Sequence, residues 1–181
     1  TGGMYVGERA DIRPFKSGGT GVQSFLEHQP DALPQRLEAG TLNGPGIAGL
    51  KAATEHIMSI GLGDIYEKEH SLQQLFLEQI REIPRIRIYG DFTPEQVRCP
   101  IVSLNIGDID STQIGSWLQE DYGIAVRTGA HCAPLMHQYF ETRAQGMVRF
   151  SFSYYNTVDE INAAADALGE IAESVVFCGR E

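Results

Sequence analysis

The chain of 181 residues has few basic side chains and very few lysines. Fourteen Lys and Arg stand against 24 Asp and Glu, a formal net charge of −10, and lysine occurs only at positions 16, 51 and 68. Such an acidic surface repels phosphate backbones, so nucleic acid is not an expected partner. The sequence has no apolar run long enough to span a bilayer and no basic-then-apolar leader, which predicts a cytoplasmic protein without membrane association.

Cysteine is also scarce. Cys99, Cys132 and Cys178 are an odd number at wide spacing, which does not resemble a disulfide framework, so we expect free thiols. His131, Cys132 and His137 could be taken as part of a zinc site. No second Cys or His pair follows at ligand spacing, however, and a structural zinc usually needs four ligands, so no metal is expected.

Composition and length indicate a globular protein with one domain and an appendage. Hydrophobic residues make up 42% and charged residues 21% of the chain, which excludes disordered and membrane classes. Residues 1–8 predict a short strand, residues 15–22 a glycine-rich hairpin or flap, and residues 27–38 an irregular connector with two prolines.

Two helices are expected first, and from Pro84 onward short strands alternate with helices. Gly61 is a stop signal for the first helix, the charge run 67–69 is expected to face water, and Thr157 with Glu160 forms a capping box for the last helix. The other expected elements are helices over about 64–82, 112–122 and 135–140, and strands over 85–89, 101–106, 124–127 and 147–154.

The start of the first helix has two interpretations. Thr41 stands just ahead of it and Pro45 suits its first turn, so the free amides and the helix dipole could hold an anion. An ordinary helix cap explains the same residues, and without a partner motif we favour the cap.

Residues 127–134 carry the best clue to chemistry. They present Cys132 between Arg127 and His131, with Gly129 freeing the backbone and Pro134 suited to open a short helix. A cation, an imidazole and a helix start are the usual means of stabilising a thiolate, which predicts a nucleophilic cysteine. A buried structural cysteine is the alternative.

Two arginines suggest what the thiol acts on. In strand 147–154, alternation places Arg149 with Ser151 and Ser153, opposite the apolar residues, and Arg127 ends its own strand. Guanidinium groups pair bidentately with carboxylates, so two arginines near one thiol would suit a substrate carboxylate. Local Asp or Glu partners remain the alternative for each arginine.

Several segments, in one order, resemble a known family. The chain is similar to the C-terminal part of cysteine desulfurases, the class V aminotransferase-like enzymes of pyridoxal-phosphate fold-type I. The matching segments are Thr1–Gly7, Glu38–Asn43, Gly123–Leu135, Val148–Ser151 and Tyr155–Thr157.

This resemblance implies roles for particular residues. Cys132 would be the nucleophile that receives sulfur from L-cysteine as a persulfide, leaving alanine. Arg149, Arg127 and His131 would bind the substrate. Thr41 would donate to the phosphate of pyridoxal 5′-phosphate in the neighbouring subunit, which implies a homodimer. A sulfur-acceptor protein, sulfur metabolism and iron–sulfur cluster assembly are implied as well.

The resemblance also implies that part of the enzyme is missing. The family's Schiff-base lysine follows a histidine and lies upstream of the segment matching Thr1, and none of the three lysines here follows a histidine. We therefore expect a C-terminal fragment, inactive alone, of an α/β protein. Residues 1–61 would be the tail of the large cofactor-binding domain, and residues 62–181 a small α+β domain with a mainly antiparallel sheet covered by helices.

Three alternatives remain open. A selenocysteine lyase or an aminotransferase of the same class would share most of these features, although an aminotransferase has no need of an active thiol. A non-catalytic sulfur-carrying or interaction domain could also retain the cysteine loop.

Overall fold

The computed structural model describes residues 1–93 and 96–178, with side chains described up to Ser174. The chain divides into two units, one of residues 1–61 and one that begins at Leu62.

The first unit consists mostly of irregular chain followed by one helix. Its 43 leading residues contain the 3-10 turn η1 (Gln35–Leu37) but no strand, so the predicted strand at 1–8 and hairpin at 15–22 are wrong. The buried Gln29 side chain organises this region by donating to the carbonyls of Gln35 and Glu38, both at 2.8 Å, and accepting from the Gly18 amide. Hydrogen bonds of the Gln29 side chain therefore connect these segments, where paired strands were expected.

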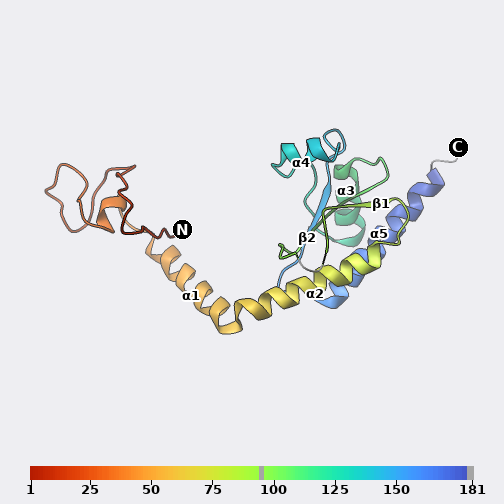
Figure 1. Ribbon diagram of the computed structural model, residues 1–181, viewed down its shortest axis with the longest axis horizontal. Coiled ribbons are helices and arrows are strands. Elements are labelled where there is room, and N and C mark those ends of the chain that lie inside the picture. The colour runs from red at the N-terminus through yellow and green to blue at the C-terminus, as the bar shows by residue number, and fades with distance from the viewer. Residues whose placement is uncertain (94–95, 179–181) are drawn as a thin grey trace. The chain divides into compact units, whose positions relative to one another are not determined.

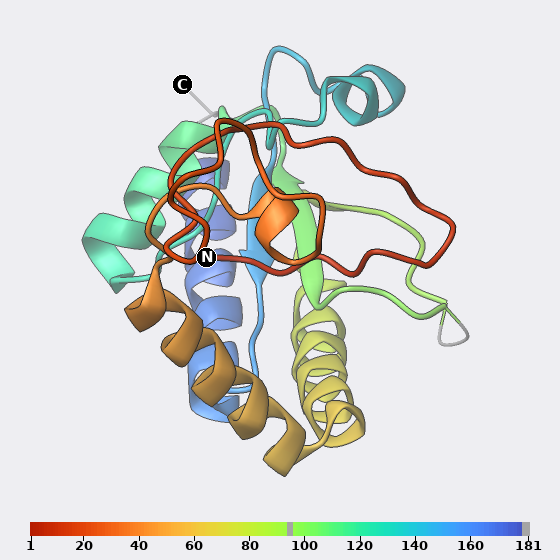
Figure 2. The same cartoon turned by 90° about the vertical axis from the view of Figure 1, so that its left-hand side faces the viewer.

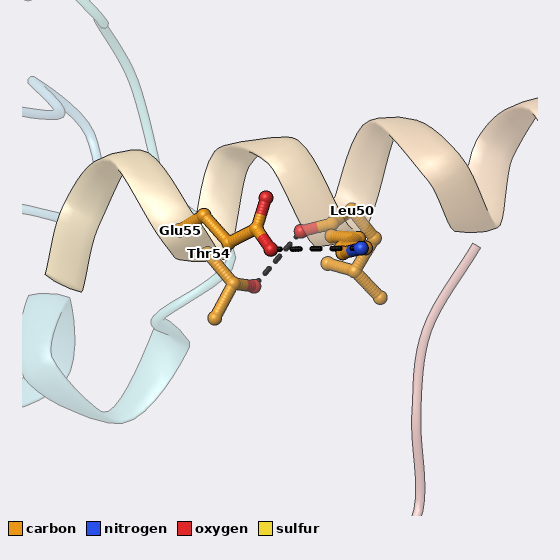
Figure 3. A network of polar contacts seen from close by, with 4 residues as sticks. Leu50, Thr54 and Glu55 are labelled. Atoms are coloured by element: carbon orange, nitrogen blue, oxygen red, sulfur yellow. Dashed lines mark hydrogen bonds and ion pairs between the residues drawn. The ribbon is translucent and has the colours of Figure 1, made fainter. Parts of the chain in front are cut away.

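Helix α1 (Gly44–Ile60) begins and ends where the cap signals predict. The Asn43 side chain accepts from the Gly46 amide at 3.1 Å, and Gly61 follows the last turn. Polar contacts along the exposed side of the helix are local: the Thr54 hydroxyl donates to the Leu50 carbonyl at 2.8 Å, and Lys51 pairs with Glu55 at 3.6 Å (Figure 3). The helix buries none of its residues within the first unit.

The second unit is an α+β fold built on a three-stranded antiparallel sheet in the order β1-β2-β3. Its elements in chain order are α2 (Leu62–Ile80), β1 (Ile86–Tyr89), β2 (Ile101–Ile106), α3 (Ser111–Tyr122), α4 (Pro134–Tyr139), β3 (Val148–Ser151) and α5 (Val158–Cys178). This confirms the small antiparallel sheet with covering helices that the resemblance implied.

The core of this unit lies between the sheet and helices α2, α3 and α5, with α2 and α5 side by side against it (Figures 1 and 2). Alternate residues of β2 and β3 face these helices and are buried, as the period-two pattern predicts. The fully buried side chains include Phe76, Ile80, Leu104, Ile114, Val148 and Leu168. Short α4 lies apart from these layers, beyond the end of the sheet (Figures 1 and 2).

Helix α2 contributes polar contacts that its sequence pattern did not predict. Gln73 is fully buried, and its amide donates to the carbonyls of Cys99 (3.2 Å) and Ile101 (2.9 Å). The charge run was expected only to face water. Instead Glu69 accepts from the Tyr154 amide at 3.1 Å, and the Lys68 ammonium lies 4.5 Å from the Tyr154 ring centroid.

Residues 124–127 do not form the expected strand. After the left-handed Gly123, the Ile124 amide donates back to the Leu118 carbonyl at 2.8 Å, so it closes helix α3 instead of pairing with β3. Only Arg127 reaches the sheet, through an isolated antiparallel bridge to Arg149. The predicted last strand is correspondingly shorter, ending at Ser151.

The capping box of the last helix is confirmed. The Glu160 amide donates to the Thr157 hydroxyl at 3.3 Å and the Glu160 carboxylate accepts from the Thr157 amide at 2.9 Å. These hydrogen bonds hold the pKa of the Glu160 carboxyl below its usual value. None of the helices in the described residues is both long and apolar enough to traverse a lipid bilayer.

Candidate active site

Cys132 lies in a turn that contains three left-handed residues. Residues 127–133, here called the cysteine turn, have φ angles of +86° at Gly129, +51° at His131 and +57° at Cys132. Left-handed geometry costs a non-glycine residue about 1–2 kcal/mol, so two consecutive ones must be held by their surroundings. The Ala133 amide closes the turn by donating to the Ala130 carbonyl at 2.9 Å, and the thiol is exposed.

The base of the cysteine turn is anchored to two elements of the fold. The Gly129 amide donates to the Ser111 hydroxyl at the start of α3 (3.2 Å), and the Gly129 carbonyl accepts from the Met147 amide just before β3 (3.2 Å). Gly146 packs directly under this point, and its own carbonyl accepts from buried Asn105 at 3.0 Å. The turn thus rests on α3, β2 and the entry to β3.

The structure brings Arg127 to the thiol and pairs Arg149 with Arg127. Arg127 and Arg149 are directly opposed across their bridge, exchanging two backbone hydrogen bonds of 3.2 and 2.8 Å, so their side chains leave the sheet on one face. The Arg127 guanidinium donates to Cys132 Sγ at 3.4 Å. Arg149 Nε is buried and has no hydrogen-bond partner among the described residues, so its hydrogen-bonding capacity is unsatisfied in this structure.

His131 contacts the backbone of Arg127. Its Nε2 lies 3.0 Å from the Arg127 carbonyl, and because a carbonyl only accepts, Nε2 must carry the proton. Burial lowers the pKa of His131, and the charges of Arg149, His137 and Arg127 lower it further, against a raising effect of the carbonyl bond. The lowered pKa favours the neutral ring, which in this hydrogen bond carries its proton on Nε2.

A buried pair of residues, His137 and Thr142, lies next to His131 and was not predicted from the sequence. His137 and Thr142 are both buried, with 3% exposure each, and His137 Nδ1 lies 2.9 Å from the Thr142 hydroxyl. The His131 and His137 rings meet edge to face, with centroids 5.9 Å apart. Thr142 carries no motif signal, because its meeting with His137 depends on the chain reversing at Glu141, where φ is +59°.

Thr41 belongs to the first unit and is described apart from the others. It is exposed and stands three residues before α1, whose cap is the Asn43 side chain. The ordinary cap that we favoured is therefore present, supplied by Asn43. Among the described residues, no cluster of three or more His, Cys, Asp or Glu side chains is arranged to hold a metal ion.

The antiparallel sheet, its covering helices and an exposed thiol beside Arg127, itself paired with Arg149, define an α+β unit suited to thiol chemistry on an anionic substrate. The chain belongs to the aminotransferase class-V family, whose sequence profile matches residues 2–164. It is 35% identical over 173 residues to a cysteine desulfurase of Shigella flexneri and 38% identical over 174 residues to one of Salmonella agona. Each alignment covers 93% of this chain and 41% of the relative, so the chain spans about two fifths of the length of these proteins.

Solved structures show the same relationship. The apo cysteine desulfurase of Thermococcus onnurineus is 28% identical with a TM-score of 0.74, over 90% of this chain and 39% of that one. The cysteine desulfurase CsdA of Escherichia coli, in an S-sulfonic acid form, is 26% identical with a TM-score of 0.74 and the same coverage. The α/β fold-type I assignment is thereby confirmed for the fragment.

Proposed function

We propose that the protein containing this chain is a cysteine desulfurase, which converts L-cysteine to alanine and retains the sulfur as a persulfide on Cys132. One observation carries the proposal: the exposed Cys132 Sγ lies 3.4 Å from the Arg127 guanidinium, and Arg127 is paired with Arg149, whose Nε has no hydrogen-bond partner in the described part of the chain. A nucleophile and an anion-binding donor thus share one face. The cysteine desulfurases among the relatives support the same conclusion.

Each residue of the candidate site has its own role in the proposed reaction. Arg149, with Arg127, binds the substrate carboxylate and so orients the substrate sulfur toward Cys132. The Cys132 thiolate attacks that sulfur and forms the S–S bond of the persulfide. The bond between sulfur and the substrate β-carbon breaks, its electron pair stays with carbon, and a proton taken up there completes alanine. His131, next to Cys132 in the chain, is suited to hold a proton on its Nδ1 during these steps.

Pyridoxal 5′-phosphate is the proposed cofactor, and when bound it supplies the electron sink for bond breaking near the substrate α-carbon. Two observations fit the group: the Arg149 guanidinium, whose Nε has no partner among the described residues, would suit a substrate carboxylate, and Thr41 presents an exposed hydroxyl that could donate to a phosphate oxygen. None of Lys16, Lys51 and Lys68 follows a histidine, so the lysine that anchors the cofactor is expected outside this chain.

The remaining assignments are proposals about the whole protein. We propose a cytoplasmic homodimer in which Thr41 serves the cofactor of the neighbouring subunit, and a sulfur-acceptor protein that takes the persulfide sulfur toward iron–sulfur cluster assembly. We also propose that residues 1–61 complete a large cofactor-binding domain while residues 62–181 form the small domain that carries the thiol.

The test uses the full-length protein with L-cysteine. Alanine and sulfide are quantified, and peptide mass spectrometry locates the extra sulfur. We expect the sulfur on Cys132 and a Cys132→Ala variant slower by about 100-fold or more, as for loss of a covalent nucleophile. The matched control Cys99→Ser, at another exposed thiol, should retain wild-type turnover.

The same experiment separates the alternatives. Full activity of Cys132→Ala on an amino-group acceptor would favour an aminotransferase, and preference for selenocysteine over cysteine would favour a selenocysteine lyase. No alanine formed by the cofactor-loaded protein would favour a sulfur-carrying or interaction domain. Extra sulfur found on Cys99 or Cys178 would overturn the assignment of Cys132.

A further inference from the structure

His137 is a buried titratable side chain that the proposed reaction does not use. It belongs to α4, is 3% exposed, and its Nδ1 lies 2.9 Å from the hydroxyl of Thr142, which is buried equally. The Thr142 amide donates in return to the His137 carbonyl at 2.9 Å. The two residues are thus joined through both side chain and backbone, which holds the imidazole in one orientation.

The ring of His137 forms one side of a clamp around His131. The two rings meet edge to face, with centroids 5.9 Å apart and planes inclined by 67°, a favoured arrangement for aromatic pairs. On its other side, His131 donates from Nε2 to the Arg127 carbonyl at 3.0 Å. His131 is held between the His137 ring and the backbone of Arg127.

Arg127 connects His131 to the Cys132 thiol. The backbone of Arg127 is bridged to Arg149, and its carbonyl accepts a hydrogen bond from His131. These two contacts fix the backbone of Arg127, whose guanidinium lies 3.4 Å from Cys132 Sγ. His131 and Cys132 are the two consecutive left-handed residues of the cysteine turn. Loss of the clamp would let that strained backbone relax and carry the sulfur away from the guanidinium.

We propose that His137, fixed by Thr142, is a positioning residue that holds His131 against Arg127 and thereby sets the reactivity of the Cys132 thiol. This inference rests on the proposed function only in taking Cys132 as the sulfur acceptor. His137 acts through His131, which predicts that its effect disappears once His131 is gone.

The probe is iodoacetamide, applied to the full-length protein near pH 7 with the alkylation rate read at Cys132 by peptide mass spectrometry. Cys99, an exposed thiol remote from the clamp in sequence, is the internal reference. We expect His137→Ala and Thr142→Val to slow alkylation of Cys132 by about three- to tenfold, because a reacting thiol develops negative charge that a guanidinium stabilises. Thr142→Ser keeps the hydroxyl and should stay within about twofold of wild type, on the scale of one hydrogen bond.

A double-mutant cycle separates positioning from general damage to the fold. The His131→Ala/His137→Ala variant should react no more slowly than His131→Ala alone. Any of three results would overturn the proposal. The two single-variant effects on alkylation of Cys132 could multiply in the double variant, alkylation could slow equally at Cys99, or Thr142→Val could leave the rate at Cys132 unchanged. If His137→Ala does not fold, the Thr142→Val and Thr142→Ser pair decides.

Alkylation needs neither cofactor nor cysteine turnover, so this result and the test of the proposed function fail independently. A clamp effect on alkylation without persulfide on Cys132 would leave the positioning role standing and remove the desulfurase assignment. Persulfide on Cys132 without any clamp effect would do the reverse.

Discussion

Arg149 offers the sharpest prediction for a single residue. Its Nε is buried without a partner among the described residues, and it stands opposite Arg127 on the polar face of β3. Arg149→Lys removes the planar fork that matches a carboxylate, so in the full-length enzyme we expect KM for L-cysteine to rise about tenfold or more, roughly 1.4 kcal/mol per tenfold, with a smaller change in kcat.

Steady-state kinetics measure this effect, and Arg143→Lys is the matched control. Arg143 is exposed, and its guanidinium donates to the Gln138 side chain at 3.0 Å. An unchanged KM in Arg149→Lys, or an equal rise in both variants, would show that Arg149 does not bind the substrate carboxylate.

At this scale, the sequence predicted the face on which a residue lies better than the residues that it meets. Alternation along 147–154 correctly placed Arg149 opposite the core, because strand faces are a local property. The pairing of Arg149 with Arg127 depends on strand register, and the contact of His137 with Thr142 on a left-handed residue at 141. Neither has a local signal in the sequence.

Among the elements, helices were predicted more accurately than strands. Helix ends depend on nearby residues. Gly61 ends α1 and Thr157 caps α5, as predicted, and Gly123 ends α3 in the left-handed conformation. A strand needs a partner that sequence alone does not identify. Residues 124–126 have no partner strand among the described residues, because the Ile124 amide donates to the Leu118 carbonyl of α3 instead.

Gly146 connects the cysteine turn to β3, and its substitution tests that connection. Its φ is +69°, and an added Cβ would collide with the Ser111 hydroxyl and lie 2.9 Å from Gly129 Cα. Gly146→Ala should therefore lower the free energy of unfolding by about 2–4 kcal/mol, from left-handed strain and overpacking together. It should also slow alkylation of Cys132, because Gly129 is the base of the cysteine turn.

Gly123→Ala is the matched control for backbone strain. Gly123 has nearly the same φ, +68°, but an added Cβ would meet no atom within 4 Å. Denaturant unfolding should show a loss of only about 1 kcal/mol, with alkylation of Cys132 unchanged. Equal losses in the two variants would mean that packing under the turn contributes nothing.

The two units differ in how they bury apolar surface. The second unit encloses a continuous core in which Phe76, Leu104 and Leu168 are fully buried. In the first unit, Tyr5, Phe15 and Phe25 are at least 91% exposed, and Gln29 and Pro30 are its only buried residues among those described. Burial of apolar surface is the main driving force of folding, so the two units should differ in autonomous stability.

We therefore expect residues 62–181, expressed alone, to unfold cooperatively in urea with a stability on the order of 5 kcal/mol, a common value for a domain of this size. Residues 1–61 alone should show no cooperative transition, because a single 17-residue helix is marginal in water without packing. Circular dichroism and amide hydrogen exchange measure both fragments. Protected amides in β2 and α5 of the larger fragment would locate its core, whereas cooperative unfolding of residues 1–61 would show that the first unit stabilises itself without apolar burial.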